Sequence, residues 1–187
     1  TTDFSIASVD SESQQIVDWE ERRVPYDCLV IVPTNMGADV MARSGLGDDL
    51  NFVPTNPATL QSKAHENIYV LGDATDLLSS KAGSVAHFQA ELLTENIASA
   101  VKGEPLTASF DGHTNCFIET GYQKAVLVDF NYQTEPLPGK YPLPVVGPFT
   151  LLGESYVNHW GKMAFRSMYW NLLVKGRSMM VPNKMSM

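Results

Sequence analysis

Hydrophobic and polar positions near the start of the chain alternate as expected for short strands. Residues 4–9 and 15–19 predict two strands joined by a polar turn, and residues 22–25 lead into a third. Residues 26–33 then form an apolar run that ends in proline, which predicts a buried strand. Cys28, in the middle of this run, is interpreted as a small structural hydrophobe.

The middle of the chain predicts a strand, a turn and a long helix. A short helix is expected at residues 38–44, and prolines make residues 50–60 irregular. The run Ile68-Tyr69-Val70-Leu71 before Gly72-Asp73 predicts a strand buried on both faces, as in a parallel sheet. Residues 82–101 have helical spacing, with Ser80 as the candidate N-cap and Gly103 as the stop. The expected core face of this helix consists of Val85, Phe88, Leu92, Leu93, Ile97 and Val101.

The last third of the chain predicts a β-hairpin followed by a helix. Residues 116–122 and 124–130 form two β-like runs divided by a glycine turn. Five prolines between residues 136 and 148 then predict an extended connection, and a helical tail begins at Glu154. No internal repeat is present.

Length and charge narrow the choice of function. The chain has 187 residues, 44% of them apolar, which is enough for a core in one domain or one and a half. Its net charge of -8 argues against a nucleic-acid surface. The charge is uneven, because residues 155–187 hold five basic residues and no acidic one, which leaves -13 for residues 1–154. Two cysteines are too few for a disulfide framework, and no apolar run approaches the length of a membrane span.

The segment from Gly72 to Ala82 carries the first candidate chemistry. Gly72 lets the backbone approach a ligand, and Asp73 offers two acceptors to a sugar or polyol hydroxyl. A plain strand-to-loop turn uses the same pair of residues. The extended context looks like the second FAD motif of flavoproteins with two dinucleotide-binding domains, and there this aspartate holds the ribityl chain. Gly72, Asp73, Ala74, Lys81 and Ala82 are therefore the candidate FAD-binding residues.

Three segments together resemble the sulfide:quinone oxidoreductases, a branch of the FAD-dependent pyridine nucleotide-disulfide oxidoreductase superfamily. They are residues 26–33, residues 72–90 and residues 110–132. The third is the most specific, since Phe110-Asp111-Gly112, Cys116, Thr120-Gly121-Tyr122 and Phe130-Asn131-Tyr132 are similar to the mitochondrial-like members. The resemblance implies that Cys116 is one of two redox-active cysteines and that its partner lies upstream, outside this chain. From the residues alone, a buried structural thiol would be favoured at this position.

The resemblance also implies a role for Lys81, which precedes the long helix. We expect it near the edge of the flavin where negative charge develops on reduction, with a solvated loop lysine as the alternative. Cys116 and Lys81 are thus the candidate catalytic residues. No metal site is expected, because the histidines are scattered singly and the cysteines have no metal-like spacing.

The tail, residues 154–176, predicts an interfacial helix. It is rich in Trp, Tyr, Phe and Met, and His159, Lys162 and Arg166 form a cationic stripe at helical spacing. We expect it to bind a membrane surface, where quinone is found, and a helix buried in a homodimer interface is the alternative. The expected localisation is a peripheral, monotopic protein of a bacterial or archaeal inner membrane. Sulfide and quinone are the expected partners, with no nucleic acid.

These predictions combine into an α/β fold with partial FAD/NAD(P)-binding, Rossmann-like elements, a β-hairpin and an amphipathic helical tail. Residues 1–60 are expected to end a nicotinamide-type domain and return to the FAD domain, residues 61–105 to close the FAD-binding domain, and residues 106–187 to form the hairpin and tail. The chain opens with Thr1 and lacks a G-x-G-x-x-G motif after a strand, so we expect the C-terminal part of a longer flavoprotein, inactive alone. A single-subunit NADH:quinone oxidoreductase and a non-catalytic docking or dimerisation module remain alternatives.

Overall fold

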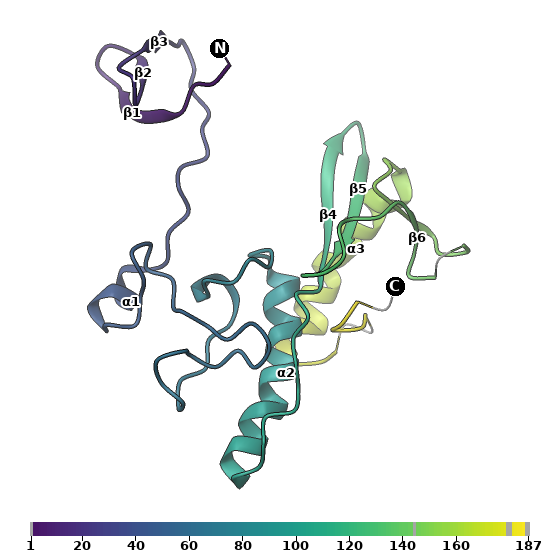
Figure 1. Cartoon of the computed structure of the whole chain (residues 1–187). Helices are drawn as coiled ribbons and strands as arrows, with labels where there is room; N and C mark the ends of the chain where they lie inside the picture. The colour runs from purple at the N-terminus through teal and green to yellow at the C-terminus, as the bar shows by residue number, and fades with distance from the viewer. Residues whose placement is uncertain (1, 144, 179–180, 186–187) are drawn as a thin grey trace. The chain divides into compact units, whose positions relative to one another are not determined.

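The computed structural model describes residues 2–143, 145–178 and 181–185. The chain divides into two compact units, residues 1–35 and 36–187. The first unit holds three antiparallel strands in the order β1 (Ile6–Asp10), β2 (Gln15–Asp18) and β3 (Arg23–Pro25), labelled in Figure 1. The first two strands are confirmed, and the third forms earlier in the chain than expected.

The predicted buried strand at residues 26–33 is wrong. This run forms no strand, and the side chains of Val30 and Val32 are 91% and 96% exposed. An apolar run becomes a buried strand only if neighbouring strands pair with it on both sides, and no described strand does so. Cys28 is exposed as well, which overturns its interpretation as a buried structural residue.

The second unit begins with α1 (Asp39–Arg43), which confirms the short helix. The predicted strand at residues 68–71 is wrong, because Tyr69 makes only an isolated antiparallel bridge to Gln61. The backbone N–H of Val70 donates to the carbonyl oxygen of Leu60 at 2.9 Å, so the segment is extended but lies in no parallel sheet. It runs directly into a single 3₁₀ turn, η1 (Gly72–Ala74).

The long helix α2 (Gly83–Lys102) is confirmed and carries the core of this unit. Gly103 ends it in the left-handed conformation, with φ +73°. Ile97 and Val101 were assigned to the core face but are exposed, because the last turns of α2 extend beyond the buried cluster. That cluster consists of Leu60, Leu77, Val85, Phe88, Leu92, Leu93 and Phe110.

The hairpin is confirmed as β4 (Thr114–Gly121) and β5 (Lys124–Phe130), paired antiparallel. Tyr122 and Gln123 form its turn, and both have positive φ, as a type I′ turn requires. The proline-rich connection, which was expected to be extended, contains the short strand β6 (Gly139–Tyr141), and a second short strand, β7 (Phe149–Leu151), follows it. The sheet order is β4-β5-β7-β6, with β7 parallel to β5.

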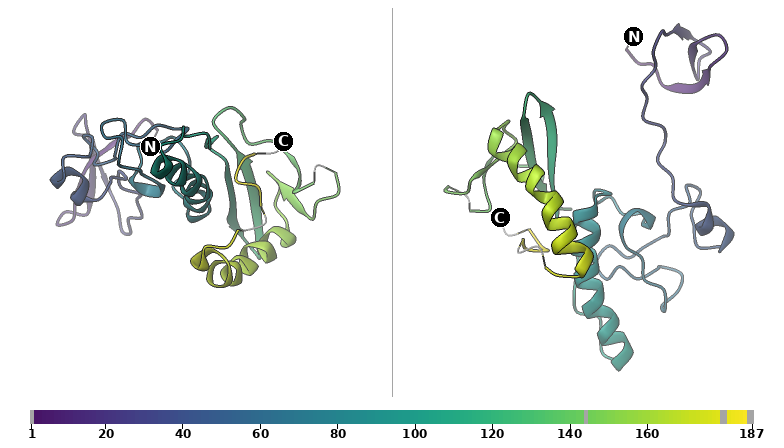
Figure 2. Two further views of the ribbon diagram at one scale, coloured as in Figure 1. Left: turned by 90° about the horizontal axis from the view of Figure 1, so that it is seen from below. Right: turned by 180° about the vertical axis from the view of Figure 1, so that it is seen from behind.

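The tail is confirmed as helix α3 (Tyr156–Asn171), followed by the 3₁₀ turn η2 (Leu173–Lys175). It packs along β4, β5 and β7, and Figure 2 shows it beside the hairpin. Ser155 caps the helix by accepting a hydrogen bond from the N–H of Asn158 at 3.0 Å. The α/β class with a β-hairpin and an amphipathic C-terminal helix is therefore confirmed.

Candidate functional site

The start of α2 lacks a capping side chain. Ala82 is the N-cap residue in place of Ser80, and it makes no side-chain cap hydrogen bond. Gly83 is exposed, and a Cβ built there would meet nothing within 4 Å. Because the first N–H groups of a helix have no partners within the helix, this end is suited to an electronegative ligand.

The Gly72–Ala74 turn is seated on one face of α2. The N–H of Gly72 donates to Oε1 of Gln89 at 2.6 Å, and a Cβ at Gly72 would lie 3.4 Å from that of Ala86. Gly72 has φ +65°, which favours glycine. Asp73 is exposed and makes no hydrogen bond or ion pair with any described residue, so its carboxylate remains available as an acceptor.

Lys81 ties the turn to the helix start. Its Nζ donates to the carbonyl oxygen of Thr75 at 2.6 Å and lies 4.6 Å from the ring centroid of Phe52. Burial lowers the pKa of Lys81, and the negative charges of Asp73 and Asp76 oppose that effect. The ammonium therefore stabilises the loop that follows Asp73, whereas its expected role toward a flavin stays a prediction.

Cys116 lies on β4 and faces the start of α2 from the side opposite the Gly72 turn. With about 3.6 residues per turn, Ser84 and Phe88, which line a cavity with Cys116, lie on the other face from Ala86 and Gln89. Burial raises the pKa of the Cys116 thiol, while hydrogen bonds from Ser84 and Ser80 lower it. The thiol is thus half-buried beside two hydroxyl groups.

The cavity has a volume of about 390 Å³ and lies between the start of α2, β4 and α3. Its walls are mainly aromatic and apolar, and Lys162 is the charged residue that lines it among the described residues. The rings of Phe117 and Phe149 meet edge to face with centroids 5.4 Å apart. Ala82 also lines this cavity, so two of the six predicted site residues, Ala82 and Cys116, meet in it.

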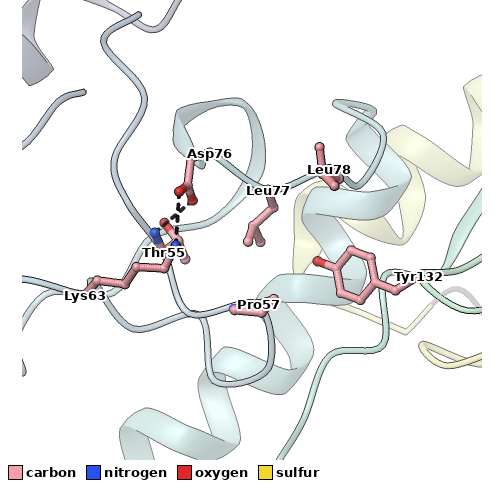
Figure 3. A pocket seen from close by; sticks show the side chains of 7 residues that line it. All are labelled: Thr55, Pro57, Lys63, Asp76, Leu77, Leu78 and Tyr132. Atoms are coloured by element: carbon pink, nitrogen blue, oxygen red, sulfur yellow. Dashed lines mark hydrogen bonds and ion pairs between the residues drawn. The ribbon is translucent and has the colours of Figure 1, made fainter. Parts of the chain in front are cut away.

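A second cavity, of about 360 Å³, is lined by none of the predicted site residues. Figure 3 shows Asp76 at its edge, with Tyr132 on the far side. The Asp76 carboxylate already accepts from the N–H of Thr55 at 2.8 Å and from Nζ of Lys63 at 3.2 Å (Figure 3). Because these contacts fix the loop itself, the cavity beside Cys116 is the stronger candidate site.

Sequence reasoning missed a buried histidine and carboxylate pair behind the cavity. Nε2 of His113 lies 2.7 Å from Oδ1 of Asp129, and both side chains are 2% exposed. The His113 ring also stacks on Phe88 with centroids 5.0 Å apart. One signal was present in the sequence, since Asp129 follows the inward positions Ala125 and Leu127 at a spacing of two.

The cationic stripe of the tail differs from its prediction. Nδ1 of His159 lies 3.0 Å from Glu119 of β4, and Nζ of Lys162 lies 4.0 Å from the same carboxylate. Two of the three basic side chains thus meet a protein carboxylate. The outer face of α3 is nevertheless apolar, with exposed Tyr156, Val157, Trp160, Met163 and Trp170. Within the described residues, no helix combines the length and apolar character needed to cross a membrane.

Among those residues there is also no group of three or more His, Cys, Asp or Glu side chains placed to hold a metal ion.

Comparison with known proteins gives one consistent group of relatives. No family model matches the sequence. The mitochondrial sulfide:quinone oxidoreductase of Schizosaccharomyces pombe is 33% identical over 81% of this chain and 33% of that protein. The proteins of the same name from Mus musculus and Dictyostelium discoideum are 29% and 33% identical, over 84% and 83% of this chain. The resemblance read from the motifs is confirmed, and the chain spans about a third of the length of these relatives.

Two solved structures share the fold. The sulfide:quinone oxidoreductase from the hyperthermophilic bacterium Aquifex aeolicus aligns with a TM-score of 0.65 at 16% identity, over 93% of this chain and 41% of that one. A chain in the structure of the Tetrahymena thermophila mitochondrial ATP synthase tetramer aligns with a TM-score of 0.60 at 24% identity, over 94% and 39%. This likeness confirms the α/β class with partial Rossmann-like elements. The three curated relatives are mitochondrial, so they do not support a bacterial or archaeal membrane.

Proposed function

From its homology with sulfide:quinone oxidoreductases, we propose that this chain is part of an FAD-dependent enzyme that oxidises sulfide and passes the electrons to quinone. The observation that carries the proposal is the cavity in which the half-buried thiol of Cys116 meets the uncapped start of α2. On the other face of the same helix lies the Gly72 turn, in which the Asp73 carboxylate has no hydrogen-bond or ion-pair partner among the described residues. One helix end therefore separates a candidate redox thiol from a candidate cofactor-binding turn.

The residues at this helix end fit an FAD. The Asp73 carboxylate, which no described residue contacts, can accept from a ribityl hydroxyl. Gly72 and Ala74 carry no large side chain that would obstruct the ligand, and Ala82 lacks a capping side chain. Gly83 leaves open space beside the first helical turn. When bound, FAD would supply the two-electron acceptor for the thiolate. Lys81 orders the loop between these groups and adds a positive charge near the helix start.

Cys116 has a defined task in this proposal. With a partner cysteine outside this chain it forms a disulfide, and HS⁻ attacks one sulfur of that bond. The S–S bond breaks as a new one forms, so that one cysteine becomes a persulfide and the other a thiolate that carries the electron pair. Burial raises the pKa of the Cys116 thiol, and the Ser84 and Ser80 hydroxyl groups offset part of this effect because they favour the thiolate form.

The tail suits a membrane-bound acceptor. Residues 154–176 expose Tyr156, Trp160 and Trp170 on the outer face of α3, while Phe165 and Met168 pack inward toward the cavity. We propose that the outer face binds the membrane surface and that quinone reaches the inner face from there. A homodimer that buries the outer face is the competing arrangement, and liposome co-sedimentation separates the two.

The proposal is tested by anaerobic titration of the flavin absorption band in the full-length protein. Sulfide should bleach the band, and Cys116→Ser should abolish this, whereas Cys28→Ser, at an exposed thiol in the other unit, should leave it intact. Bleaching by NADH alone, indifferent to Cys116, would instead support an NADH:quinone oxidoreductase. This chain alone should lose FAD on dialysis, and stoichiometric retention would refute that expectation.

A further inference from the structure

Gln89 lies in the second turn of α2 and is completely buried, at 0% exposed. Glutamine is seldom buried to this extent, because both ends of its amide need hydrogen-bond partners. Its Oε1 accepts from the N–H of Gly72 at 2.6 Å. Its Nε2 is also buried and has no hydrogen-bond partner among the described residues. The bond to Gly72 is therefore the one contact that compensates the burial of this amide in the part of the chain that the structure describes.

The other hydrogen bonds of the Gly72 turn do not reach α2. The carbonyl oxygen of Gly72 accepts from Thr75, both from its N–H at 3.2 Å and from its Oγ1 at 2.9 Å. The carbonyl oxygen of Ala74 accepts from the N–H of Val53 at 2.8 Å. These bonds shape the turn and hold it against the neighbouring loop. Among the described residues, the hydrogen bond that fixes the turn to the helix is thus the one from Gly72 to Gln89.

Close packing on the same face of α2 makes this bond exacting. Ala86 precedes Gln89 by three residues, and a Cβ added at Gly72 would lie 3.4 Å from the Cβ of Ala86. The turn therefore rests directly on the helix. Because Asp73 follows Gly72 immediately, any shift of Gly72 along the helix also moves the Asp73 carboxylate relative to the start of α2.

We propose that Gln89 is a positioning residue for FAD. By accepting from the N–H of Gly72, it holds the Asp73 carboxylate where one FAD molecule meets both that carboxylate and the start of α2. Gln89 does not itself contact the cofactor, because it is fully buried. A site whose groups are already held in place loses less freedom on binding and therefore binds more tightly. The inference rests on the proposed function and deepens it, since it adds to the cofactor site a residue that acts only through Gly72.

Gln89→Met in the full-length protein tests this role. Methionine has a similar length and volume but no amide oxygen, so the N–H of Gly72 loses its partner. The change also removes the unpaired Nε2 donor, which offsets part of the stability loss. When the protein is freed of FAD and titrated with FAD, the dissociation constant should rise about tenfold. Gln89→Leu, which also lacks an acceptor, should give the same rise and replaces the methionine variant if that variant does not fold.

Asn96→Ala is the matched control, because Asn96 is another buried amide on α2. It is 1% exposed and bonds to the backbone of Thr59 and Ala108, away from the Gly72 turn. Its loss should destabilise the protein in urea denaturation and leave the dissociation constant of FAD unchanged. If Gln89 had a purely structural role, its variants would show this same pattern.

A double-mutant cycle with Asp73→Ala shows whether Gln89 acts through the turn. If it does, Gln89→Met/Asp73→Ala should bind FAD no more weakly than Asp73→Ala alone. An unchanged dissociation constant in Gln89→Met, or losses that multiply in the double variant, would overturn the inference. Both results leave the proposed function standing, because the wild-type protein still binds FAD. A wild-type protein that binds no FAD would instead refute the inference and the proposed cofactor together.

Discussion

The Ser84 hydroxyl of α2 donates a hydrogen bond to the carbonyl oxygen of Asn115 on β4 at 3.2 Å. This contact fixes the first turn of the helix against the residue that precedes Cys116. It also places the hydroxyl beside the thiol. When the thiol ionises, the hydroxyl can turn to donate to the thiolate in place of the carbonyl oxygen, which lowers the thiol pKa against the larger, opposing effect of burial.

Replacement of Ser84 by alanine should therefore raise the pKa of Cys116. Alkylation by iodoacetamide requires the thiolate, so the pH profile of alkylation at Cys116 should move to higher pH in Ser84→Ala. Thr94→Ala is the matched control, because Thr94 is another α2 hydroxyl bonded to a backbone carbonyl, that of Ala90, at 2.8 Å. An unchanged profile in Ser84→Ala would show that the hydroxyl does not act on the thiol.

Replacement of Asn158 by alanine should destabilise the second unit strongly. The side chain is fully buried, and its Nδ2 donates to the carbonyl oxygens of Ala125, Thr150 and Gly153, which join β5, β7 and α3. Loss of these bonds in a buried site should lower the free energy of unfolding by about 2–4 kcal/mol, measured by urea denaturation.

Asn171→Ala provides the control for this variant. Asn171 is an exposed asparagine on the same helix, and among the described residues its side chain bonds only to Ser167. It should change the free energy of unfolding by less than about 0.5 kcal/mol. Similar losses in the two variants would contradict the assigned role of Asn158.

Replacement of Gly161 by alanine should reshape the cavity. A Cβ there would lie 2.5 Å from Cε1 of Phe149 and 3.0 Å from Cζ of Phe117, so the two rings must move. We expect a loss of about 1–3 kcal/mol in stability from overpacking, together with weaker binding of a small quinone, duroquinone. Gly176→Ala, with open space around it but φ +65°, should cost stability without changing binding, and equal binding losses would argue against the cavity as the site.

The buried pair behind the cavity should show strong coupling. His113→Phe keeps an aromatic ring against Phe88 but removes the main contact of the Asp129 carboxylate, and this should cost about 3–5 kcal/mol. The double variant His113→Phe/Asp129→Leu should recover part of that loss, because no buried carboxylate is left unpaired.

His159→Phe tests the same change in a less buried pair, with Glu119, and should cost less than about 1 kcal/mol. Thermal unfolding of wild type, His113→Phe, Asp129→Leu and the double variant measures the coupling between His113 and Asp129. Additive losses in the double variant would show that His113 and Asp129 do not act as a pair.

The sequence predicted the elements whose signals are local. The α2 helix, the β4–β5 hairpin and α3 follow from helical spacing, strand alternation and turn residues, all of which are contained in each segment. The apolar runs at residues 26–33 and 68–71 also suggested strands, but a strand in a parallel sheet is specified by its neighbours, and none pairs with them. Local sequence cannot supply a pairing partner.

The candidate site was predicted only in part, because local motifs identify single residues but not the distant residues that pack beside them. Cys116 and Ala82 were identified by motif resemblance, and the structure places both at one cavity. Tyr141, which also lines this cavity, carried no sequence signal, because it lies in a proline-rich segment that predicted no strand. Asp129 did carry one, since a charged residue at an inward position of an alternating strand indicates a buried partner.

The most direct test of the account is to trap the sulfur species on Cys116. The full-length protein would be treated anaerobically with sulfide, alkylated, and digested, and the peptide that contains Cys116 analysed by mass spectrometry. In the wild-type protein we predict an additional sulfur atom on Cys116 or on its partner cysteine. In Cys116→Ser the partner cysteine should carry no added sulfur. Two results together would contradict the account: no added sulfur on either cysteine in the wild-type protein, and reduction of the flavin by sulfide in the Cys116→Ser variant.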